Sequence, residues 1–172
     1  RGMAAEFSLK NLGVTLFYSK NYKDATIGTS SDSSEAYIEN FYTTGIHTTP
    51  SLLLKKDAIS ELAYGINLSY NFKNIRMGFT WSGDRFSLPV KPSGNDPAGI
   101  FKFAGKSNNL YTFSYNSLIK RFLLYGELSI NEYKKIAFVQ GFSFRPSDRL
   151  TINFLARKYS AGYISFNGSV AG

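Results

Sequence analysis

The single histidine, His47, is the side chain of this sequence best suited to acid–base chemistry near neutral pH. It lies in the run TTGIHTTPS, beside the hydroxyls of Thr44, Thr48 and Thr49. A histidine that takes a proton from one of these hydroxyls, with Asp57 orienting its ring, would create a nucleophile of the kind that hydrolases use. Because serine and threonine are abundant in this chain, the spacing does not specify a triad. We expect His47 to order a loop.

Three acidic residues, Glu6, Asp84 and Glu127, are the second candidates for chemistry, since paired carboxylates can act as acid and base. Acidic side chains on an enclosed face usually pair with arginine instead. We therefore expect an ion pair between Asp84 and an arginine, and the candidates are Arg76, Arg145 and Arg157.

Basic and aromatic residues alternate in the run GIFKFAGKSNN, where Lys102 and Lys106 flank Phe101 and Phe103. Nucleic-acid sites combine cations for the backbone with rings that stack on bases. A solvated loop or strand edge has the same composition, so nucleic acid remains one alternative partner.

The composition excludes several chemistries. The chain of 172 residues has no cysteine and one histidine, which excludes a disulfide framework, a thiolate metal site and a multi-histidine centre. No glycine loop for phosphate, zinc spacing or calcium loop is present in the sequence. We predict neither a metal nor a cofactor. The net charge of +8 favours anionic partners such as nucleic acid, acidic glycans or lipid phosphates.

Alternation with a period of two dominates the chain. In LAYGINLSYNF, residues 62–72, large apolar side chains alternate with small or polar ones, and the pattern resumes after a turn in IRMGFTWSGDR. The same pattern recurs within residues 3–18, 109–131, 136–145 and 150–157, which gives about eight strands. No stretch reaches the roughly 18 to 20 apolar residues of a membrane helix, whereas a membrane strand needs only about 9 to 11 residues.

Connections between these strands alternate in length. Short turns are expected near residues 11–13, 73–74, 118–121 and 146–148, with a short link at 132–135 and long loops at about 24–58 and 86–107. Thr49 followed by Pro50 predicts a short helical turn in the first long loop. Tight turns at one end and long loops at the other are typical of outer-membrane barrels.

The two faces of the strands differ in kind. One carries large aromatic and aliphatic side chains, and the other is rich in Gly, Ser and Asn. Small residues with few, mixed charges fit a confined lumen better than a water-exposed surface. The predicted lipid-facing aromatic residues are Tyr70, Phe79, Trp81, Phe113, Phe138, Phe142 and Phe154. The predicted lumen-facing charged residues are Glu6, Lys10, Arg76, Asp84, Glu127, Arg145 and Arg157. The alternative is a soluble β-barrel or sandwich with an aromatic core that binds a lipophilic or glycan ligand.

Several runs of the sequence resemble a known family. These are TTGIHTTPSLLLKKDAISELAYGINLSYNFKNIRMGFTW, KFAGKSNNLYTFSYN, LLYGELSIN and GFSFRPSDRLTINFLARKYSAGY. They are similar to the barrel portion of outer-membrane proteins of Bacteroidota that carry, elsewhere in the chain, a helix-hairpin-helix module like that of competence DNA-uptake proteins. The resemblance implies a barrel within a larger protein and a connection with the uptake of DNA or another polyanion. No such helical pair is recognisable in this sequence.

The sequence therefore predicts an all-β, antiparallel up-and-down meander of about eight strands, forming a single domain over residues 1–172. We expect a transmembrane β-barrel, or a segment of a larger one, in the outer membrane of a Gram-negative bacterium. Its function would be that of a pore, plugged channel or surface platform without catalysis. The expected partners are outer-membrane lipid and lipopolysaccharide, together with other subunits or the remainder of a larger barrel.

Overall fold

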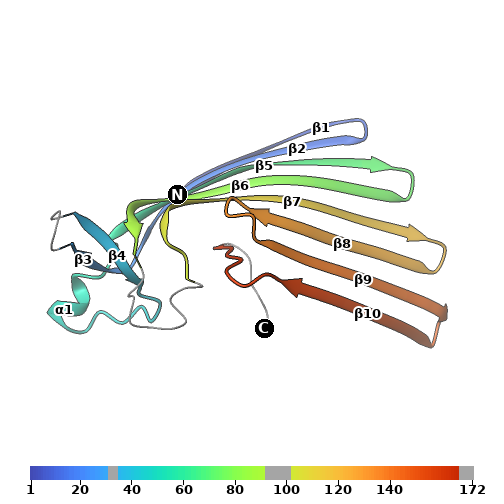
Figure 1. Cartoon of the computed structure of the whole chain (residues 1–172). Helices are drawn as coiled ribbons and strands as arrows, with labels where there is room; N and C mark the ends of the chain where they lie inside the picture. Colours follow the sequence, from blue (N-terminus) through green and yellow to red (C-terminus); the bar gives the residue numbers. More distant parts are fainter. Residues whose placement is uncertain (31–34, 92–101, 167–172) are drawn as a thin grey trace.

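The computed structural model describes residues 1–30, 35–91 and 102–166. They form an almost entirely antiparallel sheet with one helical turn (Figure 1). The strands are β1 (Gly2–Leu9), β2 (Leu12–Lys23), β3 (Ala25–Thr29), β4 (Ala36–Phe41), β5 (Ile59–Phe72), β6 (Ile75–Val90), β7 (Gly105–Ile119), β8 (Phe122–Asn131), β9 (Ile136–Ser147) and β10 (Leu150–Tyr159), and the helical turn is α1 (Pro50–Leu53). Among the described residues no helix is long and apolar enough to cross a membrane.

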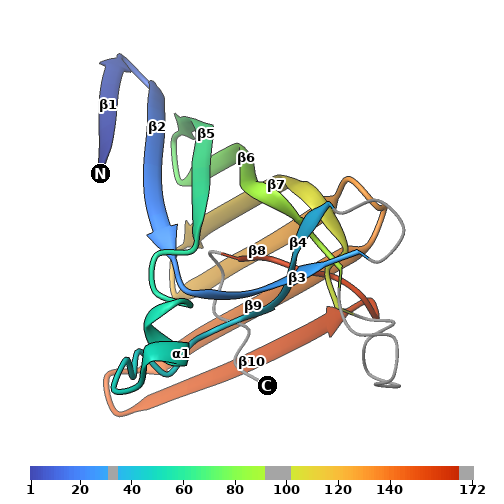
Figure 2. The same cartoon turned by 90° about the vertical axis from the view of Figure 1, so that its left-hand side faces the viewer.

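Eight of the strands follow one another in an up-and-down meander. Their order in the sheet is β1-β2-β5-β6-β7-β8-β9-β10, and each pairs antiparallel with the next. This confirms the predicted fold class. The sheet curls, as Figure 2 shows, but β1 and β10 do not pair with each other, so it stays open.

The hairpin turns at one end are shorter than predicted. β7 continues to Ile119 and β8 begins at Phe122, so only Lys120 and Arg121 form a turn where the sequence predicts one over residues 118–121. β9 runs through Pro146 to Ser147, which moves the last turn to residues 148–149. Two-residue turns with positive φ match the natural twist of a hairpin, and Lys120 has φ 54°.

The two predicted long loops hold more structure than expected. Residues 24–58 contain the β3–β4 hairpin and α1, whose predicted start is confirmed because the Thr49 side chain accepts a hydrogen bond from Leu52 N at 3.3 Å. The segment predicted as a loop at 86–107 begins and ends in strand, since β6 extends to Val90 and β7 starts at Gly105. In the described part of the chain the number of strands is therefore ten, against the eight or so predicted.

Glycines opposite aromatic rings help the sheet to curl. A Cβ at Gly141 would collide with the Tyr125 ring, and one at Gly65 would lie 2.5 Å from Cζ of Phe17. Each ring thus lies against a glycine of the neighbouring strand, at a position where any larger residue would collide with it. Such pairs permit strong local bending while covering the exposed backbone.

Candidate functional site

The sheet has two faces of opposite character, which we call the aromatic face and the polar face. By strand register, the aromatic face carries Ile66, Trp81 and Tyr111 in one row and Leu68, Phe79 and Phe113 in the next. The polar face carries between them a row made of Thr15, Asn67, Thr80, Thr112, Ser129 and Ala137.

Many of the large side chains on the aromatic face are exposed. Of the seven predicted lipid-facing residues, five are exposed, from 40% at Phe138 to 62% at Phe154, and the other three of these are Tyr70, Phe79 and Phe113. Trp81 and Phe142 are half-buried. The Trp81 ring packs edge-to-face on Tyr64, with centroids 5.5 Å apart. The large side chains therefore do not form a shared core across this sheet.

The polar face is the inner side of the curl, and hydrogen bonds link its side chains. Asn67 Nδ2 donates to Thr80 Oγ1 at 2.7 Å, and the hydroxyls of Thr112 and Ser129 lie 2.8 Å apart. Tyr163, after β10, donates its hydroxyl to Ser129 at 2.8 Å. The segment that follows β10 therefore lies against this face.

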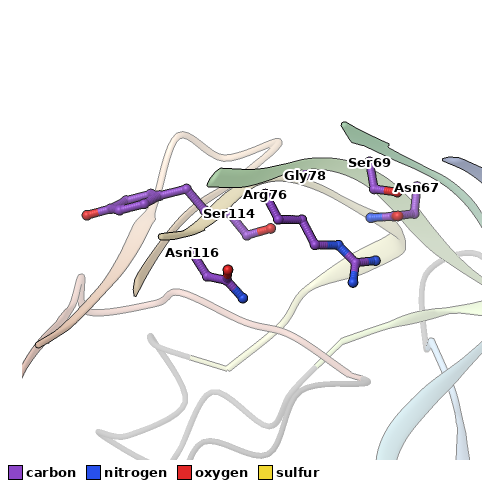
Figure 3. A pocket seen from close by; sticks show the side chains of 7 residues that line it. Asn67, Ser69, Arg76, Gly78, Ser114 and Asn116 are labelled. Carbon is purple, nitrogen blue, oxygen red and sulfur yellow. The ribbon is translucent and has the colours of Figure 1, made fainter. Parts of the chain in front are cut away.

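A polar recess of about 300 Å³ lies on this face, toward the tight turns (Figure 3). Its lining is Asn67, Ser69, Arg76, Gly78, Ser114, Tyr115 and Asn116. Arg76 extends its guanidinium on the same side of the ribbon as the Asn116 amide and the Ser114 hydroxyl. The lining combines one cation with amides and hydroxyls, which are groups that bind anions and alcohols.

A second recess of about 460 Å³ lies closer to the turns, across β7, β8 and β9. Lys120, Arg121 and Arg145 line it together with Asp148. Arg121 donates to the Pro146 carbonyl, and Arg145 Nη2 lies 3.6 Å from Asp148 Oδ1. This end of the polar face is therefore predominantly basic.

The predicted lumen-facing charges occupy different parts of the sheet. Register places Glu6, Arg76, Glu127 and Arg157 on the polar face, with Glu127 beside Ser114, and Lys10 forms part of the first tight turn. That these side chains face an aqueous lumen stays a prediction.

The expected ion pair between Asp84 and Arg76 does not form. Asp84 is 2% exposed and lies eight positions from Arg76 along β6, about 26 Å at the usual rise of a strand. That distance is beyond the reach of the two side chains. Arg145 pairs with Asp148 instead, and a pair with Arg157 stays a prediction.

A compact aromatic cluster covers the polar face at the end opposite the tight turns. It consists of the buried residues Ala25, Ile38, Ile59, Phe86, Val90 and Phe103, with Phe41 and Phe166 packed against them. The rings of Phe86 and Phe166 meet edge-to-face at 5.0 Å, and beside the cluster Lys23 Nζ pairs with the buried Glu61 at 2.6 Å. Because β4 and the segment after β10 both border the cluster, residues far apart in sequence meet at this end.

Sequence reasoning missed this cluster. The signal was Phe86, a large aromatic residue in a polar position of the alternation that runs through Arg76, Thr80 and Asp84.

His47 is held between two acceptors. Its Nε2 lies 2.9 Å from Asp24 Oδ2 and its Nδ1 lies 3.2 Å from the Leu52 carbonyl oxygen. The carboxylate at the ring is that of Asp24 and not that of Asp57, whose backbone N–H donates to Asp24 Oδ1 at 2.8 Å. The hydrolase interpretation, in which Asp57 orients the ring, is therefore not supported, and the position of the ring between Asp24 and the α1 carbonyl of Leu52 fits the expectation that His47 orders this loop.

The position of Phe103 does not fit the nucleic-acid site suggested by the alternating basic and aromatic residues. It is 6% exposed within the aromatic cluster, so its ring is not available to stack on a base, and Phe101 lies outside the described residues. Nearby, the Tyr133 hydroxyl donates to the Ala104 carbonyl at 3.2 Å. Burial, and then the charge of Glu132 and a hydrogen bond to it, raise the pKa of Tyr133.

Within residues 1–30, 35–91 and 102–166, no three His, Cys, Asp or Glu side chains are grouped to hold a metal ion. Comparison with known proteins adds no relative, since no family model, curated protein or solved structure matches the chain.

Proposed function

We propose that this chain forms part of the wall of a β-barrel in the outer membrane of a Gram-negative bacterium. The aromatic face would contact the acyl chains of phospholipid and lipopolysaccharide, while the polar face would line the interior. In this role the protein is a pore, a plugged channel or a surface platform, and it performs no catalysis.

The observation that carries this proposal is the inverted distribution of side chains. Large apolar residues such as Phe79 and Phe113 are exposed on the outside of the curl, whereas Asp84, Asn108 and Ser129 on the inner side are at most 2% exposed. Water penalises an extended apolar surface of this kind, and hydrocarbon does not. A soluble sandwich would bury the same aromatic residues between its sheets.

The open edges add a requirement for partners. β1 is exposed along all eight of its residues, and beyond β2 it pairs with no other described strand. An unpaired strand edge in hydrocarbon leaves backbone groups without hydrogen bonds, at several kcal/mol each. The remainder of a larger barrel, or other subunits, would supply the missing strands.

The aromatic cluster supports the plugged form of the proposal. It places Phe41, Phe86, Phe103 and Phe166 against the polar face at the long-loop end, where an open pore would need water. The sequence resemblance to Bacteroidota barrels extends the proposal to the uptake of DNA or another polyanion, and the positive net charge is consistent with such a cargo.

The single tryptophan provides a direct test. The chain is refolded into vesicles of lipids brominated on their acyl chains, and Trp81 fluorescence is compared with that in unbrominated vesicles. We expect strong quenching, because Trp81 lies on the aromatic face. The matched control carries Trp81→Phe and Ser82→Trp, which moves the indole to the polar face of the same strand, and quenching should be weak.

Two results would contradict the proposal. One is equal quenching of the two proteins. The other is a chain that stays in the aqueous phase without detergent and gives no quenching, which favours the soluble ligand-binding alternative. As a further check, the refolded protein should migrate differently on a gel before and after boiling.

A further inference from the structure

We propose that the polar recess around Arg76 binds a small anionic solute rich in hydroxyl groups, such as a sugar phosphate. The inference rests on the proposed function, because it names the class of solute for the interior that this function requires. All residues that line the recess belong to this chain, so binding of a solute can be measured in detergent, apart from insertion into a membrane.

Arg76 supplies the positive charge. Arg76 is an exposed residue on the polar face. Within the described part of the chain, its guanidinium forms no hydrogen bond or ion pair. An arginine fork binds phosphate or carboxylate oxygens through two parallel N–H groups. A guanidinium left without a protein acceptor inside a recess is therefore prepared for an anion.

The rest of the lining supplies groups that bind hydroxyls. Asn116 lies beside Arg76 on the neighbouring strand, and Ser69 and Ser114 lie on either side of Gly78 in the next row. The Asn67 amide nitrogen is committed to Thr80 at 2.7 Å, which leaves its amide oxygen as an acceptor. Amides and hydroxyls in this arrangement offer both donors and acceptors to a sugar.

Gly78 opens the floor of the recess. A Cβ at this position would lie 2.7 Å from Ser114 Oγ, so any side chain would fill part of the space. The resulting volume of about 300 Å³ lies at the lower end of the range for small-ligand sites. It exceeds what one inorganic phosphate requires.

The surrounding charge favours an anion at this end of the sheet. The neighbouring recess adds Lys120, Arg121 and Arg145, while the acidic groups close by are Asp148 and Glu127, which is the strand neighbour of Ser114. Three of the two-residue turns also begin with a lysine at positive φ: Lys10, Lys73 and Lys120. Asparagine or glycine adopts this conformation more easily, so the recurrence of lysine points to a use for its charge.

The test measures binding to the full chain folded in detergent, by titration calorimetry with glucose 6-phosphate. Glucose and inorganic phosphate are the two comparison ligands. We expect glucose 6-phosphate to bind more tightly than either, and Arg76→Gln to weaken it about tenfold or more. The control is Arg85→Gln, which removes the same side chain from the other face of β6 and should leave the affinity unchanged.

Two further variants keep the test decisive. Gly78→Ala should weaken glucose 6-phosphate more than inorganic phosphate, because it narrows the recess without removing charge. Arg76→Lys should weaken binding several-fold, and it replaces Arg76→Gln if circular dichroism shows that the latter does not fold.

The outcomes separate the site from the membrane. Equal affinity in folded Arg76 variants and the Arg85→Gln control, or glucose or inorganic phosphate binding as tightly as glucose 6-phosphate, would overturn the inference. A chain that shows Trp81 quenching by brominated lipid but binds no anion retains the proposed function and loses this site. A chain that binds the anion but never enters vesicles retains this binding site and loses the proposed function in the membrane.

Discussion

Phe113→Arg distinguishes a lipid-facing surface from a water-exposed one by the size of its effect. Phe113 is 45% exposed at the centre of β7, between Phe79 and Leu128 on the neighbouring strands. In water, replacing an exposed phenylalanine with arginine would be nearly neutral, within about 0.5 kcal/mol. In lipid, the same charge has to leave water and enter hydrocarbon.

The depth of Phe113 sets the magnitude. It lies six residues from the end of β7 at Ile119, which is about 20 Å along the strand. A tilt of roughly 45° converts this to about 14 Å along the membrane normal, close to the middle of an apolar band about 25 Å tall. Arginine at the midplane of such a barrel destabilises it by about 2 to 4 kcal/mol.

The assay is equilibrium unfolding by guanidinium chloride in lipid vesicles, which gives the free energy of unfolding of each variant. Ile119→Arg is the matched control, because it lies on the same strand and face but at the turn, where the expected loss is about 0 to 1 kcal/mol. Phe113→Leu controls for loss of the ring. Equal effects at the two positions, or stabilisation by Phe113→Arg, would refute the lipid-facing interpretation.

Four further changes test other parts of the structure. Phe86→Ala should destabilise the fold by about 3 to 5 kcal/mol and expose the β3–β4 hairpin to limited proteolysis, because Phe86 is 1% exposed in the aromatic cluster; resistance to protease equal to wild type would contradict its role. Gly141→Ala should cost about 1 to 3 kcal/mol by chemical denaturation, since the new methyl would meet the Tyr125 ring, and the loss should shrink when Tyr125→Ala is added. Lys73→Gly should raise the free energy of unfolding by about 0.5 to 1 kcal/mol, because φ is 51° there; a lower value would show that the lysine side chain contributes more than the backbone strain removes. His47→Ala should speed amide hydrogen exchange in α1 without changing lipid quenching, and unchanged exchange would mean that the ring does not hold this loop.

The meander was predictable because one physical pattern repeats along it. In β5, from Leu62 to Phe72, every second side chain is large and apolar, and a strand places alternate side chains on opposite faces. The same alternation assigns Arg76 and Glu127 to the face of small and polar residues, and the strand register places both there.

The parts that escaped prediction depend on contacts between distant residues. β4 joins the sheet through a single bridge between Ile38 and Val90, a separation that no local pattern reveals. His47 contacts Asp24 rather than Asp57 because the segment around α1 folds back onto the start of β3, which lies more than twenty residues earlier in the sequence. The recess around Arg76 likewise needs β5, β6 and β7 side by side in register.

The chain order of the meander has a consequence for assembly. Apart from the inserted β3–β4 hairpin, every strand lies beside the strand that precedes or follows it in sequence. Each hairpin can pair with the one already formed, so the loss of loop-closure entropy that opposes each addition to the sheet is small. In the closed barrel that we propose, the pairing of β1 and β10 with their missing neighbours would be the step that brings remote segments together, and we expect it to be the slowest step of assembly.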